Sequence, residues 1–253
     1  MNIPEYSYLQ HRYEKQGISA LKEIIENCSA GSIIIWDLDY TLLGPNDRSF
    51  NLAVVSKYRT TFFQAISRLS NGERNEFLNF LCYKINTIPV QPKNIQRIFS
   101  SIHNRKIHTL GLSSMTHRNF CDIKRPHETR IDILGKSGIQ FTSDTSKSLS
   151  TGVLYKGAVF SDSVMNEGKA EALRSYLLDH GLNDSKKIIY IDDNPDNFKE
   201  LSKYLGQSFE IKFLEFLATF SPNDLTVTGS EFENCIHNWV EMFKSTYSGH
   251  RSG

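Results

Sequence analysis

The chain has 253 residues, which is enough for one sizeable α/β domain with an insertion or for two small domains. Its 29 Lys and Arg residues nearly balance its 28 Asp and Glu residues, so neither nucleic acid nor an acidic membrane is expected as a default partner. An apolar fraction of 39% with 11% aromatic residues excludes an intrinsically disordered chain.

The N-terminal sequence is polar, and it predicts neither a signal peptide nor a membrane span. Residues 1–16 lack the apolar stretch that signal peptides carry. No run in the chain approaches the roughly 18 apolar residues that a transmembrane helix needs. The 4 cysteines are widely scattered, without the paired spacing of zinc or redox motifs. We therefore expect a cytoplasmic protein, and export by a route that reads no cleavable signal stays open.

A helix within residues 1–30 and then a buried strand are the first expected elements. The strand begins at Ile33, because the run from there is apolar and rich in β-branched residues. It leads into Asp37 and Asp39, which point to the same side if the extended backbone continues. Two carboxylates placed together repel each other and are costly to bury, unless a metal cation or a shared proton compensates them. A functional pair is therefore favoured over a simple turn.

This strand end resembles the first motif of the haloacid dehalogenase (HAD) superfamily, in which an apolar strand runs into Asp-x-Asp-x-Thr (residues 37–41). In that family the first Asp is a nucleophile and the second is a general acid/base. The resemblance implies an α/β fold of the Rossmann-like HAD type, a three-layer sandwich around a central parallel sheet. It also implies that three further motifs follow in a fixed order.

The segment of residues 49–87 reads as a helical insertion between two strands. Apolar residues recur there at helical spacing in two stretches, with Asn71-Gly72 as the turn between them, and residues 44–47 predict a turn before the first. The segment is too long for an ordinary loop. By resemblance it is a C1-type cap that covers the active site, and residues 1–48 and 88–253 form the core domain. An extra structural helical layer is the alternative.

A second parallel strand is expected over residues 107–112, after a helix that begins at Pro92. It ends at Ser113 and Ser114. A strand ending in Ser or Thr resembles the second HAD motif, which implies that Ser113, with Ser114 beside it, binds phosphoryl oxygens.

His117 and Arg118 follow at the expected rim of this edge, where they either contact substrate or lie in a solvated loop. Farther along, the pattern predicts a helix over residues 126–134 and a polar loop over residues 142–151. Two short strands then turn at Lys156-Gly157.

Lys169 lies in the first turn of an expected amphipathic helix that starts near Asn166. A lysine there opposes the helix macrodipole, which favours anions at the N-terminus. The position makes sense if the ammonium group faces a bound anion and the carboxylates. It resembles the third HAD motif, whereas a solvated lysine would be the preferred interpretation without the other motifs.

A second acidic cluster, Asp192 and Asp193, ends another apolar strand over residues 186–191. Two acidic clusters at strand ends are what a divalent cation site requires. A turn with Pro195 as the first helical residue explains the polar residues that follow, but not two adjacent carboxylates at the strand end. The pair resembles the fourth HAD motif in its double-Asp form.

The C-terminal part predicts a further strand within residues 209–217 and a long amphipathic helix. Ser230 and Glu233 match a capping box at the start of this helix. Its apolar residues share one face, which we expect to pack on the sheet, and a partner-binding helix is the alternative.

Together the motifs imply a Mg²⁺-dependent phosphatase that acts on a small phosphorylated metabolite or phosphoester through an aspartyl-phosphate. By resemblance, Asp37 attacks phosphorus and Asp39 first protonates the leaving oxygen and then activates water. Lys169 and Ser113 bind the phosphoryl group.

The resemblance implies that Mg²⁺ is held by the Asp37 carboxylate, the Asp39 backbone carbonyl and Asp193. Asp192 is then a second ligand or an orienter of Lys169. Ligation by oxygen atoms alone suits Mg²⁺ and not zinc.

A carboxylate at the position of Asp39 is typical of the phosphatases and phosphomutases of the superfamily. A phosphomutase, which needs the same residues, is therefore one alternative. A non-catalytic domain that binds phosphate or a protein is another, although the intact Asp37, Asp39, Lys169 and Asp193 argue against it.

The chain also resembles a bacterial HAD branch known only as a domain of unknown function. This resemblance rests on four stretches: residues 88–90 before the Pro92 helix, residues 111–113, residues 138–141, and Gly168-Lys169 followed by residues 190–193. That branch usually has Thr-Ala-Arg where this chain has Ser113-Ser114-Met115, so the chain departs from it at the second motif.

Overall fold

A mostly parallel sheet of seven strands forms the centre of the computed structural model, which describes residues 18–29, 31–161, 166–182, 187–206, 208–216 and 226–251. The strand order is β5-β6-β7-β4-β1-β8-β9. The strands are β1 (Ile33–Asp37), β4 (His108–Ser113), β5 (Ser146–Leu149), β6 (Gly152–Tyr155), β7 (Ala158–Ser161), β8 (Lys187–Asp192) and β9 (Glu210–Glu215). β6 runs antiparallel to both neighbours, and the other pairs are parallel. This central, mostly parallel sheet confirms the predicted Rossmann-like α/β fold.

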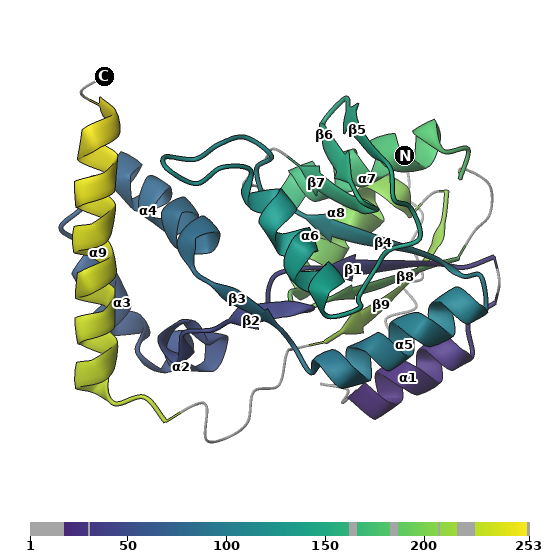
Figure 1. The fold of residues 1–253 in the computed structure, drawn as a ribbon, viewed down its shortest axis with the longest axis horizontal. Coiled ribbons are helices and arrows are strands. Elements are labelled where there is room, and N and C mark those ends of the chain that lie inside the picture. Colours follow the sequence, from purple (N-terminus) through teal and green to yellow (C-terminus); the bar gives the residue numbers. More distant parts are fainter. Residues whose placement is uncertain are drawn as a thin grey trace, which may run out of the picture.

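Helices cover both faces of the sheet (Figure 1). One face is covered by α1 (Ile18–Glu26), α5 (Pro92–Asn104) and α6 (Pro126–Lys136), and the other by α7 (Asn166–Asp179) and α8 (Pro195–Leu205). Successive residues of β1 point to opposite faces, so Ile34 packs on the first layer and Ile35 on the second. Both faces are buried, which is why the strand is apolar along its whole length.

The strand register brings three strand ends to one edge of the sheet. β1 lies between β4 and β8, with Asp37 level with Leu112 and Trp36 level with Ile191. Asp192 therefore ends β8 beside Asp37. The carboxyl edge of such a sheet is where α/β folds bind ligands.

The backbone turns sharply after β1. Tyr40 has φ 65°, and the N–H groups of Leu42 and Leu43 both donate to Leu38 O (2.9 and 2.8 Å). Asp39 lies in this turn and not on an extended strand. The prediction that Asp37 and Asp39 point to the same side required an extended backbone, so it does not apply here.

A small second sheet follows the turn and joins the core to the helices beyond it. β2 (Leu43–Pro45) pairs antiparallel with β3 (Thr87–Pro89). The prediction of a turn over residues 44–47 is wrong for its first half, because Gly44 and Pro45 belong to β2.

The helical insertion, which we define as residues 48–85, lies between β2 and β3. Its helices are η1 (Arg48–Phe50), α2 (Leu52–Lys57), α3 (Arg59–Ile66) and α4 (Asn71–Lys84). Asn71 and Gly72 are the first two residues of α4. The turn predicted at these two residues therefore lies before them in the chain. Ser70 and Glu73 form a capping box that starts the helix, with the Ser70 N–H donating to Glu73 Oε2 at 2.9 Å.

The long C-terminal helix α9 (Gly229–Arg251) packs on the helical insertion and not on the sheet, so the predicted packing is wrong. Figure 1 shows α9 beside α3 and α4, at the end of the molecule away from the sheet. Phe232, Ile236 and Phe243 lie in one buried apolar cluster with insertion residues such as Phe77 and Phe80. An amphipathic pattern shows which face is buried but not what covers it.

The start of α9 is also two residues earlier than predicted. Its capping box consists of Thr228 and Glu231, not Ser230 and Glu233. The Thr228 N–H donates to Glu231 Oε2 at 2.8 Å, and the Glu231 N–H donates to Thr228 Oγ1 at 3.3 Å.

We predict that Phe243→Ala destabilises the protein by about 3–5 kcal/mol, because it removes a buried ring from the contact between α9 and the insertion. Phe243 is 1% exposed and touches the rings of Phe77 and Phe80 at centroid distances of 5.5 and 5.6 Å. Chemical denaturation measures the loss. The control is Met242→Ala on the same helix, a residue 42% exposed, for which a change within about 0.5 kcal/mol is expected.

The region predicted as a polar loop contains the edge strand β5. Ser146, Lys147 and Ser148 are exposed, and polar residues are typical of an edge strand because they discourage pairing with other chains. The predicted turn of the next hairpin is confirmed, with Lys156 and Gly157 both at positive φ (44° and 76°). Within the described part of the chain, no helix has the length and apolar character to cross a membrane.

Candidate functional site

A buried ammonium group lies between two buried carboxylates at the carboxyl edge of the sheet. The Nζ atom of Lys169 donates to Asp37 Oδ1 and, at 3.2 Å, to Asp192 Oδ2. Asp37 and Lys169 are each 4% exposed, and Asp192 is 0% exposed. Residues Ile35 and Tyr190, two positions before each Asp, pack toward α7 and α8. Strand alternation therefore points both carboxylates at the first turn of α7, where Lys169 lies.

Hydrogen bonds hold Asp192 in a fixed orientation. Its Oδ1 accepts from the backbone N–H of Asn194 (2.8 Å) and from Asn197 Nδ2 (3.0 Å). Its Oδ2 accepts from the Tyr190 hydroxyl, from Asn197 Nδ2 (2.8 Å) and from Lys169. A carboxylate has about four acceptor positions, and these four donor groups use all of them.

Asp193 adds a third carboxylate that is only partly buried. One carboxylate oxygen from each of Asp37, Asp192 and Asp193 lies within 4.8 Å of the others. Burial, followed by the charge of Asp192, raises the pKa of Asp193 to about 7. Burial and Asp192 also hold the pKa of Asp37 well above its usual range, against the opposing effect of Lys169. Burial and mutual repulsion therefore disfavour the charged forms of these two carboxyl groups.

Lys169 stays charged in this environment. Burial alone would lower the pKa of Lys169, but the carboxylates of Asp37 and Asp192 outweigh it and raise that pKa above the usual range of a lysine. The ammonium group therefore supplies a permanent positive charge beside Asp37.

Thr41 and Asp39, the other polar residues of the first motif, take different positions. The Thr41 hydroxyl is buried and donates to Asp37 Oδ2 at 3.3 Å. Asp39 is not among the three clustered carboxylates of the described residues. Its side chain is 32% exposed, and its Oδ1 lies 3.1 Å from Nε of Arg130, a buried residue of α6.

Ser113 lies at the same edge as Asp37, one residue beyond Leu112, which pairs with Asp37 in the neighbouring strand. It is 4% exposed, and its hydroxyl accepts from the Met115 N–H at 3.3 Å. Ser114 is partly buried in the loop that follows.

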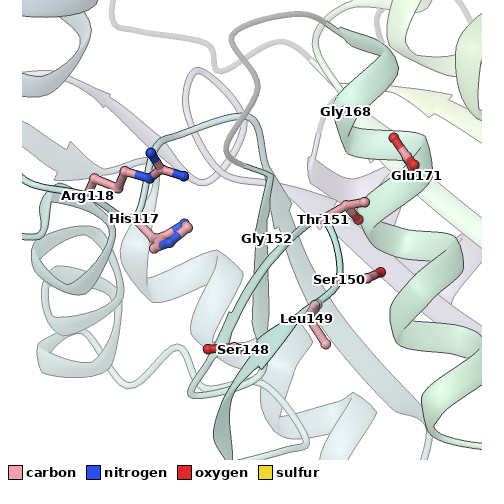
Figure 2. A pocket seen from close by; sticks show the side chains of 9 residues that line it. All are labelled: His117, Arg118, Ser148, Leu149, Ser150, Thr151, Gly152, Gly168 and Glu171. Atoms are coloured by element: carbon pink, nitrogen blue, oxygen red, sulfur yellow. The ribbon is translucent and has the colours of Figure 1, made fainter.

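A pocket of about 490 Å³ adjoins this edge (Figure 2). His117 and Arg118 line one side of it, Thr151 and Glu171 lie on the other side, and Gly168 precedes Lys169. The loop after β4 therefore lines a pocket that reaches Gly168, the neighbour of Lys169 in the chain, but none of the buried carboxylates and not Lys169 itself is among the lining residues.

Residues 14–241, most of the chain, match a family described as protein of unknown function (DUF2608). The chain belongs to the DUF2608 family. No curated protein and no solved structure matches it.

Three residues around the site of this DUF2608 protein were not predicted from the sequence: Tyr190, Asn197 and Arg130. Tyr190 precedes Asp192 by two positions on one strand, so alternation could have placed them together. Asn197 lies in the first turn of α8, within reach of the strand end before it. Arg130 has no such signal, because its partners lie on elements distant in sequence.

Proposed function

We propose that this DUF2608 protein is a phosphohydrolase of the HAD type, which transfers the phosphoryl group of a small phosphoester to Asp37 and then to water. The observation that supports it most is the buried contact of Lys169 with Asp37 and Asp192. A carboxylate at a strand end that is kept beside a permanently charged ammonium group matches the needs of nucleophilic attack on an anionic phosphoester.

In this mechanism a carboxylate oxygen of Asp37 attacks phosphorus, and the bond between phosphorus and the leaving oxygen breaks. Asp39 donates a proton to that oxygen and later takes one from the water that cleaves the aspartyl-phosphate. Lys169 attracts the negative charge of the phosphoryl oxygens, and Ser113 donates a hydrogen bond to one of them. Thr41 keeps the Asp37 carboxylate in a fixed orientation through its hydrogen bond.

The donor set of the site suits Mg²⁺. The clustered ligands are carboxylate oxygens, which Mg²⁺ prefers, and a cation would offset the burial and mutual repulsion that raise the pKa values of Asp37 and Asp193. Asp37, Asp193 and the backbone carbonyl of Asp39 would hold the ion, which would supply positive charge to the phosphoryl oxygens. Asp192 is better suited to orienting Lys169, because its acceptor positions are already used by hydrogen bonds.

The helical insertion and α9, which packs on it, would together act as the C1-type cap, so the core predicted as residues 1–48 and 88–253 would lose α9 to the cap. The part of the substrate beyond the phosphoryl group would lie in the 490 Å³ pocket next to Gly168. His117 and Arg118 would then contact it.

The stability of the protein is expected to depend on pH and Mg²⁺ together. The folded-state pKa of Asp193, about 7, lies above the unfolded value of about 4, so the folded protein binds a proton there that the unfolded chain has lost. Stability should therefore fall as the pH rises from about 4 to about 7. Mg²⁺ competes with that proton, so it should raise Tm more at pH 8 than at pH 5.

Thermal unfolding with Mg²⁺ and with chelator, at both pH values, measures this effect. In Asp193→Asn, the rise in Tm caused by Mg²⁺ should be nearly the same at pH 8 and at pH 5. An equal effect of Mg²⁺ on wild type and variant would contradict the assignment of Asp193 as a ligand.

The proposed activity is tested by hydrolysis of a generic aryl phosphate with Mg²⁺ and with excess chelator. Mg²⁺-dependent release of phosphate would support the phosphatase. Transfer of the phosphoryl group between positions of a sugar phosphate, without net release, would favour the phosphomutase. Binding of phosphate with neither reaction would favour the non-catalytic domain.

A further inference from the structure

Arg130 connects three parts of the chain that meet beside Asp39. Its side chain is 5% exposed and extends from α6 to the end of the helical insertion. Nη2 donates to Cys82 O (2.5 Å) in α4, and Nη1 donates to Ile85 O (3.3 Å) and to Thr87 Oγ1 (2.9 Å). Nε lies 3.1 Å from Asp39 Oδ1, which makes an ion pair but not a hydrogen bond.

These contacts suit the charge and shape of a guanidinium group. The last carbonyl groups of a helix lack partners within the helix and carry partial negative charge, which Arg130 meets at the end of α4. The N–H groups of a guanidinium form a rigid, planar fork. Arg130 can therefore reach α4, Thr87 and Asp39 at the same time only while these three keep their relative positions.

The contacts cross a boundary that is not fully packed. A cavity of about 60 Å³ lies here, with Asp39 and Arg130 among its lining residues on the core side and Leu81, Cys82 and Ile85 on the insertion side. Polar contacts of one side chain, and not apolar packing alone, therefore connect the insertion to the core at this point.

A second arginine, Arg105, also donates to carbonyl groups at the end of a helix, but it is not paired with a carboxylate of the site. Arg105 donates to Ile25 O (2.6 Å) and to Cys28 O, and so closes the C-terminal end of α1. This contact lies on the helical layer away from Asp37 and Lys169. Arg105 therefore offers a matched control for the effect of removing a guanidinium from a helix end.

We infer that Arg130 is a positioning residue that ties the Asp39 carboxylate to the end of the helical insertion, so that the placement of the insertion on the core sets the orientation of Asp39. The structural half of this inference stands on the contacts alone. The kinetic half rests on the proposed function, because it takes Asp39 as the acid/base of the reaction.

Hydrogen exchange tests the structural half in protein without substrate. Arg130→Gln should speed exchange of the amides of residues 81–89 by about tenfold or more, because α4 loses partners for its last carbonyl groups. Asp39→Asn should speed exchange in the same segment, since Arg130 loses its paired charge. Arg105→Gln should affect only the amides at the end of α1. Unchanged exchange of residues 81–89 in Asp39→Asn would overturn the coupling.

Steady-state kinetics on an aryl phosphate tests the kinetic half. Arg130→Gln should lower kcat by about tenfold to a hundredfold, as expected for a misplaced acid/base, with KM within about twofold of wild type. Arg130→Lys should recover part of the loss, and Arg105→Gln should leave kcat unchanged. Wild-type kcat in a folded Arg130→Gln would overturn the positioning role. If wild type has no turnover, the proposed function fails, and the exchange experiment still decides the coupling.

Discussion

Asp37→Asn is expected to lower kcat by at least about a thousandfold while the protein stays folded. The amide of Asn is a far weaker nucleophile than a carboxylate, so no aspartyl-phosphate can form at this position. The fold should persist because Lys169 keeps its contact with Asp192, and because the change removes one of three mutually repelling carboxylates.

Initial rates of aryl phosphate hydrolysis, together with circular dichroism and Tm, measure this effect. Asp196→Asn is the matched control, because Asp196 is exposed in the first turn of α8 and pairs only with Lys199 among the contacts described. It should leave kcat unchanged. Asp37→Asn with a rate within about tenfold of wild type would exclude Asp37 as the nucleophile.

Lys169→Met should affect both stability and activity. It leaves the buried carboxylates of Asp37 and Asp192 without their cation, and breaking a buried pair in this way costs about 3–5 kcal/mol. The rate should fall by about a hundredfold or more, and phosphate should inhibit less, because the positive charge beside the phosphoryl oxygens is lost.

Denaturation and inhibition by inorganic phosphate measure the two effects separately. The control is Lys199→Met, which removes an exposed ion pair with Asp196 (side chains 73% and 66% exposed) and should cost at most about 1 kcal/mol. A folded Lys169→Met that keeps the wild-type rate and phosphate inhibition would leave Lys169 with a structural role alone.

The arrangement of the buried cluster could be predicted because each part of it is local in sequence. An apolar run that ends in Asp predicts both a buried strand and the edge at which it ends, as for Asp37 and Asp192. A lysine in the first turn of a helix after such a strand points to the same edge. The prediction required only the usual geometry of parallel strands and the helices between them.

The position of Asp39 could not be predicted in the same way. Strand alternation applies only while the backbone stays extended, and the chain turns at Tyr40, which has φ 65°. The partner of Asp39 is Arg130, which lies 91 positions later in the chain (130 − 39). A pattern of neighbouring residues contains no information about such a contact.

The helix α9 shows a similar limit for packing. Its apolar stripe predicts that one face is buried, but the sheet and the helical insertion both offer apolar surfaces to cover it. Its start was also ambiguous, because Thr228-x-x-Glu231 and Ser230-x-x-Glu233 both match a capping box. The structure uses the first pair, in which the backbone N–H of each residue donates to the side chain of the other.

Acid quenching of the protein during hydrolysis of an aryl phosphate tests whether Asp37 carries the phosphoryl group during turnover, as proposed. Mass spectrometry of peptides from protein quenched during hydrolysis of an aryl phosphate should find a phosphoryl group on Asp37, labile to hydroxylamine and absent from Asp37→Asn. Rapid turnover with Asp37 unmodified at every quench time, or with the phosphoryl group on another residue, would exclude Asp37 as the residue that carries the phosphoryl group.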